Sequence, residues 1–153
     1  MANADGTYGG RAVTDVVNCT SRNLRQATRA VTQAYDAALQ PTGLRVTQFN
    51  LLATLAKGGD MPLTKLAEAL VMDRTTLTRN LKPLVARKLI RVGTGNDQRV
   101  RQISIAPAGL TAFQDAIPYW RIAQLQLVKR LGKRRWAGLL DDLALAVHAT
   151  QES

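Results

Sequence analysis

Residues 64–105 decide the fold of this chain, and they read TKLAEALVMDRTTLTRNLKPLVARKLIRVGTGNDQRVRQISI. A short apolar-periodic segment at about residues 64–70 is followed by a three-residue connection and a longer helical pattern over residues 74–88. Asp73 stands where a helix N-cap is needed, because its carboxylate can accept hydrogen bonds from the free amides of the first turn. This order predicts two helices joined by a tight turn.

The residues after the longer helix predict a β hairpin. Residues 89–92 favour a strand, residues 93–97 have the Gly, Asn and Asp composition of a turn, and residues 100–106 form a second strand pattern. A short helix, a tight turn, a capped longer helix and a hairpin form a winged helix-turn-helix. The predicted fold class is therefore mainly α with a small antiparallel β hairpin.

The flanking segments predict a loose tail and long helices. The tail covers residues 1–12, an amphipathic helix covers residues 14–40, the winged helix-turn-helix covers residues 44–106, and two further helices cover residues 107–150. Thr47 is the expected N-cap of the helix that precedes the short one.

Prolines and glycines set the expected ends and bends of the later helices. Pro107 suits a first helical turn, although Ala106 before it is a poor cap, and Gly132 ends that helix. Pro83 and Pro118 lie within helical patterns and predict bends, because proline lacks the amide that donates to the preceding turn.

The charge is strongly positive and unevenly distributed. The 153 residues include 21 Lys and Arg against 11 Asp and Glu, a net charge of +10. Residues 61–106 hold nine of the cations and three of the anions. A basic segment within a globular pattern predicts a polyanionic partner, because counterion release drives such binding. Charge alone leaves double-stranded DNA, RNA, an anionic membrane and a merely solvated surface as alternatives.

Composition also argues against a membrane protein, a secreted disulfide-rich protein and a zinc protein. The longest apolar run, Leu143–Val147, is far too short to span a bilayer, and no signal-peptide core follows Met1, so a cytoplasmic protein without a membrane partner is expected. One cysteine, Cys19, and one histidine, His148, exclude a disulfide framework and the usual Cys/His zinc sites within one chain. We expect no metal, no cofactor and no catalytic residues, and an enzyme with an unrecognised site is the least favoured hypothesis.

The start of the longer helix has the side chains that reading a DNA major groove requires. The groove admits one α-helix, whose first turns must offer short donors and acceptors beside longer basic groups. At the hairpin tip, an arginine can enter the neighbouring minor groove, and Asp97 can hold Arg99 there through a charge-assisted hydrogen bond. The candidate residues on the helix are Arg74, Thr75, Thr76, Thr78, Arg79 and Lys82, and those on the hairpin are Asp97, Arg99 and Arg101.

These residues belong to a pattern that resembles the MarR family of bacterial transcriptional regulators across roughly residues 14–150. Each matching stretch is weak alone, but five in this order and spacing are specific. They are Thr47-Gln48-Phe49-Asn50-Leu51-Leu52, Leu66-Ala67-Glu68-Ala69-Leu70, Met72-Asp73-Arg74-Thr75-Thr76-Leu77-Thr78-Arg79, Asp97-Gln98-Arg99-Val100-Arg101 and Ile105-Ala106-Pro107-Ala108-Gly109.

The resemblance implies a homodimer in which residues 14–40 and 107–150 of both subunits interlock. It implies that residues 74–82 lie in the major groove, that Arg99 enters the minor groove, and that near-palindromic promoter sites are repressed until a small ligand or an oxidant releases the protein. We expect Thr47, Lys65, Lys82 and Arg101 to contact phosphates and set the register. Base reading is not expected of three further cations, which would serve phosphates or solubility: Arg87, Lys88 and Arg91.

Cys19, the two tryptophans and the function of the chain as a whole each have an alternative interpretation. One MarR branch places a peroxide-reactive cysteine near the position of Cys19, but a buried, inert cysteine is commoner. Trp120 and Trp136 can line an effector pocket, although at helical spacing they are more often core or interface residues. The alternative to a specific regulator is a non-specific protein that coats nucleic acid, for which affinity would be equal for any duplex.

Overall fold

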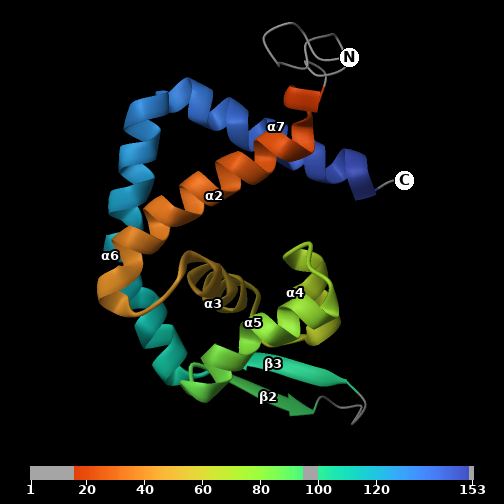
Figure 1. Cartoon of the computed structure of the whole chain (residues 1–153). Helices are drawn as coiled ribbons and strands as arrows, with labels where there is room; N and C mark the ends of the chain where they lie inside the picture. Colours follow the sequence, from red (N-terminus) through yellow and green to blue (C-terminus); the bar gives the residue numbers. More distant parts are fainter. Residues whose placement is uncertain (1–15, 95–99, 152–153) are drawn as a thin grey trace, which may run out of the picture. The chain divides into compact units, whose positions relative to one another are not determined.

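The computed structural model describes residues 16–94 and 100–151 (Figure 1). By internal contacts the chain divides into two units, Met1–Ala34 and Tyr35–Ser153. The predicted tail and two hairpin-tip residues, Asp97 and Arg99, lie outside the described residues. The elements are α2 (Thr20–Leu39), η1 (Gln40–Thr42), α3 (Val46–Gly58), β1 (Met61–Pro62), α4 (Leu63–Ala69), α5 (Arg74–Ala86), β2 (Ile90–Thr94), β3 (Arg101–Ile105), α6 (Pro107–Leu131) and α7 (Lys133–Gln151).

Helix α2 begins at Thr20, and a turn at residues 18–19 separates it from residues 16–17, which are also helical. The first two residues of the predicted helix, 14–15, lie outside the described residues. Only Tyr35 and Leu39 of this helix are buried, whereas its apolar residues Leu24 and Val31 are exposed. The Tyr35 hydroxyl donates a hydrogen bond to the Oε1 atom of Gln124, which ties the end of α2 to α6.

The prediction that Thr47 caps α3 is wrong. The helix begins one residue earlier, at Val46, and Thr47 lies exposed within its first turn. Asp36 Oδ1 accepts from the Val46 amide at 2.7 Å, so a carboxylate from the preceding helix satisfies one of the orphan donors. Gln48 Oε1 accepts from the Arg45 amide at 3.1 Å and satisfies another.

The predicted cap of α5 is confirmed. Asp73 Oδ1 accepts from the Thr76 amide at 2.8 Å, and the helix then runs through Pro83 to Ala86. Its buried side consists of three leucines, Leu77, Leu81 and Leu84. Val85 of the same helix is 42% exposed, because it faces a surface hollow rather than the core.

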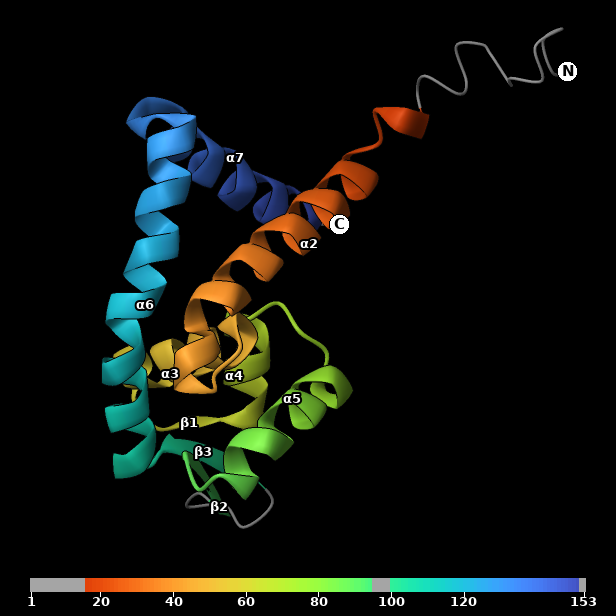
Figure 2. The same cartoon turned by 60° about the vertical axis from the view of Figure 1, so that its left-hand side comes forward.

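The sheet has three strands instead of the expected two-stranded hairpin. Strands β2 and β3 pair antiparallel, with Val92 opposite Ile103, as the hairpin prediction requires. On the other edge of β3, the two-residue strand β1 places Met61 opposite Ile103, which gives the order β1-β3-β2 (Figure 2). A two-residue strand has too few residues for a period-two pattern, so the sequence did not reveal it.

Helix α6 starts at Pro107 and ends before Gly132, as predicted, and it continues through Pro118. Its first part packs on the core through aromatic rings: Phe49 lies 5.0 Å from Phe113 and stacks on Trp120 at 5.9 Å, measured between ring centroids. Trp120 is therefore a half-buried residue that packs against the core. Among the described residues, no helix is both long enough and apolar enough to cross a bilayer.

We predict that Gly109→Ala destabilises the fold. A Cβ atom added at Gly109 would lie 1.9 Å from the backbone carbonyl oxygen of Leu89. Because a backbone atom cannot move aside as a side chain can, the start of α6 would have to shift away from Leu89. Overpacking of this kind costs about 1–3 kcal/mol of unfolding free energy, measurable by urea denaturation.

Gly138→Ala is the matched control. A Cβ atom at Gly138, inside α7, meets nothing within 4 Å. The substitution should raise the unfolding free energy by about 0.5–1 kcal/mol, because alanine loses less backbone entropy in a helix. Equal effects of the two substitutions would contradict the proposed close approach.

Candidate nucleic-acid interface

Helix α5 presents a polar and basic face because its leucine face is buried. Arg74, Thr75, Arg79 and Lys82 are all exposed on the described surface. The Thr76 hydroxyl and amide both donate to Asp73, and these hydrogen bonds hold the pKa of the Asp73 carboxyl below its ordinary value. The charged cap fixes where the helix begins and hence which side chains lie in its first turns.

The three threonines of this face differ in what they can offer a base. The Thr76 hydroxyl donates to Asp73 Oδ2 at 2.6 Å, and the Thr78 hydroxyl donates to the Arg74 carbonyl at 2.7 Å. In this state both hydroxyls offer acceptor lone pairs only. Thr75 is exposed at the start of the helix.

The structure brings residues predicted from separate stretches of sequence into one hollow. Arg74 and Thr78 of α5 line a space of about 390 Å³ together with Arg101 of β3. Thr64, at the start of α4, lines the same space and was missed by the sequence analysis, because nothing in its local sequence shows that α4 meets β3 here. Two guanidinium groups beside one hollow form a site suited to a phosphate oxygen.

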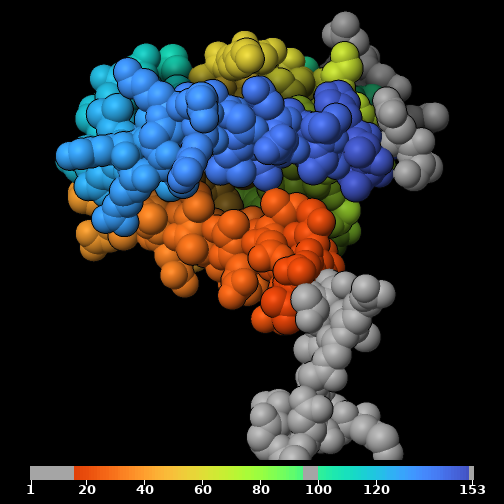
Figure 3. All heavy atoms as spheres, turned by 90° about the horizontal axis from the view of Figure 1, so that it is seen from above, coloured from red at the N-terminus to blue at the C-terminus, as the bar shows by residue number. Residues whose placement is uncertain are grey.

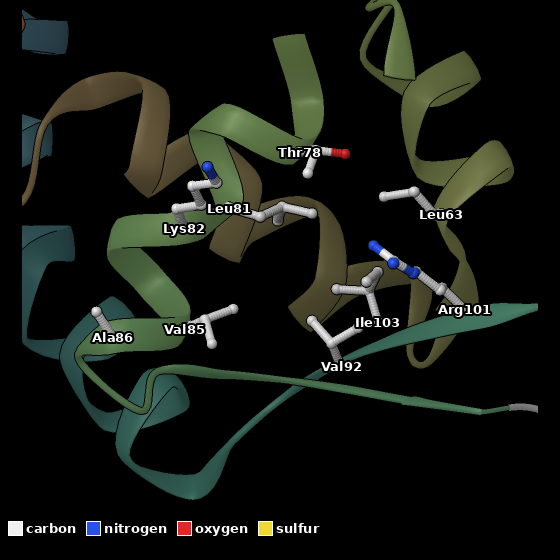
Figure 4. A pocket seen from close by; sticks show the side chains of 9 residues that line it. All are labelled: Leu63, Thr78, Leu81, Lys82, Val85, Ala86, Val92, Arg101 and Ile103. Carbon is white, nitrogen blue, oxygen red and sulfur yellow. The ribbon is translucent and has the colours of Figure 1, made fainter. Parts of the chain in front are cut away.

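A second hollow, of about 370 Å³, lies between α5 and the sheet (Figure 4). Figure 4 shows the Arg101 side chain extending from β3 toward this space. Its lining is mostly apolar, with Lys82 and Thr78 contributed by α5. The nine lining residues are Leu63, Thr78, Leu81, Lys82, Val85, Ala86, Val92, Arg101 and Ile103.

Two further predicted residues, Thr47 and Lys65, are exposed but lie apart from these hollows. Thr47 is on α3 and Lys65 is on α4, and neither lines the two hollows beside α5. Asp97 and Arg99 lie outside the described residues, so their pairing stays a prediction. No group of three or more His, Cys, Asp or Glu side chains gathers within residues 16–94 and 100–151.

Arg87 makes a contact that sequence reasoning missed. Its Nη1 donor lies 2.8 Å from the carbonyl oxygen of Gly43, in the turn that joins α2 to α3. Gly43 has a left-handed backbone conformation, with φ of 67°, and it ends the short helix η1. Because Arg87 is the C-cap residue of α5, this bond ties the end of α5 to the α2–α3 junction.

Together, a short helix, a capped helix with a basic outer face and a paired wing define a winged helix-turn-helix of the DNA-binding class.

The sequence profile of the MarR family matches residues 42–100. The transcriptional regulator MosR of M. tuberculosis, in complex with DNA, is similar over 88% of this chain and 97% of its own, with 36% identity and a TM-score of 0.80. A comparison with curated proteins gave no match.

Two more distant structures share the fold. A MarR mutant from E. coli, complexed with operator DNA, has a TM-score of 0.75 at 20% identity over 82% of this chain and 91% of its own. Bordetella bronchiseptica BpsR, whose DNA binding is regulated by 6-hydroxynicotinic acid, has a TM-score of 0.76 at 20% identity over 84% and 93%. The chain belongs to the MarR family of DNA-binding transcriptional regulators.

The Asp73 cap predicts an acid-sensitive fold. Since the pKa of Asp73 is lower in the folded chain than in the unfolded chain, its stabilisation is complete above the unfolded pKa and is lost as pH falls through the folded pKa. Asp73→Asn keeps a neutral cap without this titration. The difference in melting temperature between wild type and Asp73→Asn should shrink on acidification, and a constant difference would contradict the assignment.

The contact of Arg87 predicts a different salt response from that of Lys82. Lys82→Met should weaken duplex binding and reduce the slope of log affinity against log salt by about one, because one phosphate contact is lost. Arg87→Met should weaken binding with an unchanged slope if the Arg87 guanidinium acts through the carbonyl of Gly43, to which it donates, instead of through a phosphate. Fluorescence anisotropy over a salt series measures both, and a reduced slope for Arg87→Met would contradict the positioning role.

Proposed function

We propose that this chain is a homodimeric repressor of near-palindromic promoter sites that a small ligand or an oxidant releases. The observation that supports this most directly is the capped α5 helix, whose buried leucines leave Arg74, Thr75 and Arg79 exposed. Such a helix can enter a major groove with its first turns against base edges.

In this proposal, phosphate contacts set the register and base contacts supply the specificity. The DNA backbone oxygens are bound by Lys65, Lys82 and Arg101. Arg74 lines the same hollow as Arg101. Thr47, although it does not cap α3, is exposed near the start of that helix and remains a proposed phosphate contact. Thr75, Thr76, Thr78 and Arg79 read bases, and Arg99, held by Asp97, reads the minor groove.

The dimer is proposed from apolar side chains that the described surface leaves uncovered. Helix α7 has 19 residues, none of them buried. Leu139, Leu140, Leu143 and Leu145 of this helix are exposed by 37–67%. Large exposed apolar surfaces of this kind mark protein interfaces. We assign residues 14–40 and 107–150 to dimerisation and residues 44–106 to DNA binding.

Release by oxidation is proposed through Cys19. This cysteine is exposed, and the backbone amides of Arg22 and Ser21 lower the pKa of its thiol, which favours the reactive thiolate. We also propose a small organic effector as the alternative trigger, a cytoplasmic location and no enzymatic activity. A non-specific coating role is the alternative function, which the basic composition alone would permit.

The test of the function is binding to a labelled duplex from the intergenic region upstream of the chain's own gene, in excess unrelated duplex at physiological salt. The proposal predicts binding at nanomolar protein, in the usual range for specific sites. Loss of the signal to the competitor would favour the coating role. Arg99→Ala should lower affinity for this site, and unchanged affinity and specificity would contradict the wing assignment.

The redox proposal is tested separately with Cys19→Ser in the same assay. Peroxide should release the wild type from the duplex and leave the variant bound, because the variant has no thiol to oxidise. Release of both proteins by peroxide would show that Cys19 is not the sensor. Retention of both would exclude release by peroxide.

A further inference from the structure

A second basic surface lies at the junction of α6 and α7, and the proposed operator contacts leave it unused. Residues 129–135 read KRLGKRR, so five of seven residues are cations. All five are exposed: Lys129, Arg130, Lys133, Arg134 and Arg135. We call this surface the basic corner.

The helix ends make the basic corner electrostatically costly. Lys129 and Arg130 occupy the last turn of α6, where the macrodipole favours cations. The three cations that begin α7 have the opposite relation, because they lie at the positive end of that helix and its first turn contains no acidic residue. Residues 116–140 contain neither Asp nor Glu, so no nearby carboxylate in the sequence offsets these charges. An anion bound here would relieve the repulsion.

The basic corner is far from the elements that are proposed to read the operator. Helix α6 leaves the sheet at Pro107, and its 25 residues make it about 37 Å long. Figures 1 and 2 both place the α6–α7 junction at the end of α6 remote from β2, β3 and α5. In Figure 3 the side chains of this junction stand on the molecular surface. A straight duplex segment lying against α5 and the wing would not reach them.

The basic corner lies within residues 107–150, which are assigned to dimerisation, but the dimer is argued from the exposed leucines at positions 139–145 and not from these cations. The chemistry of the basic corner favours a phosphate backbone over a protein partner. Protein interfaces have an apolar core within a polar rim, whereas backbone contacts require cations alone. The exposed side chains over residues 129–135 are all cations, and the neighbouring Leu131 and Trp136 are half-buried. Their number matches the several phosphates that a short stretch of duplex presents, one per 1.7 Å of helix axis.

We propose that the basic corner binds the phosphate backbone of a second DNA duplex, so that the operator-bound protein bridges two duplexes. This inference rests on the proposed function, because the first duplex is held by α5 and the wing. It assigns residues 129–135 a role in DNA bridging that is independent of sequence reading.

The test uses the full chain bound to an operator duplex on beads, with a labelled duplex of unrelated sequence, about 30 base pairs long, added second. The wild type should capture the second duplex. Lys133→Gln/Arg134→Gln/Arg135→Gln should keep its operator affinity and capture the second duplex about a hundredfold more weakly at physiological salt, as the loss of three phosphate contacts implies. The control Arg22→Gln/Arg25→Gln/Arg29→Gln removes the same charge from exposed positions of α2 and should capture normally. Both triple variants lie in segments assigned to dimerisation, so light scattering first confirms that each has the oligomeric state of the wild type.

Three results would overturn the proposal. One is equal capture by the wild type and the basic-corner variant. Another is the absence of capture by a wild type that holds the operator. The third is displacement of the second duplex by poly-glutamate as readily as by DNA, since the surface would then favour an acidic protein. Retention on the operator beads is read before the second duplex is added, so a failure of the proposed function is distinguishable from a failure of bridging.

Discussion

Burial of the leucine side of α5 is the constraint on which the rest of the structure depends. Leu77 and Leu84 are fully buried, and Leu81 is nearly so. Because a helix has 3.6 residues per turn, fixing these positions inward forces the intervening arginines and threonines outward. Asp73 fixes the start of the same helix, so the cap and the buried stripe together determine which side chains a groove would meet.

Features that depend on local chemistry were predictable from the sequence. The Asp73 cap, the start of α6 at Pro107 and its end before Gly132 are all set by one residue and its neighbours in the chain. The β2–β3 hairpin was predictable because both strands and the turn lie within one short stretch.

Features that depend on distant residues were not predictable. Asp36 caps α3 from the preceding helix, so the nearby Thr47 was the wrong choice. Arg87 meets Gly43 across 44 residues of sequence, and β1 exists only because β3 lies beside it. For the candidate site, the residue types were predictable, but the meeting of Arg74, Thr64 and Arg101 around one hollow required the fold.

The central claim is that α5 reads bases in the major groove at two places, one from each subunit. Methylation interference on the operator tests this most directly, because methylation of guanine N7 blocks major-groove contacts and leaves backbone phosphates intact. We expect interference in two clusters about 10 base pairs apart, or a multiple of that spacing, on one side of the duplex. Binding that is unaffected by methylation at any guanine would contradict base reading by α5.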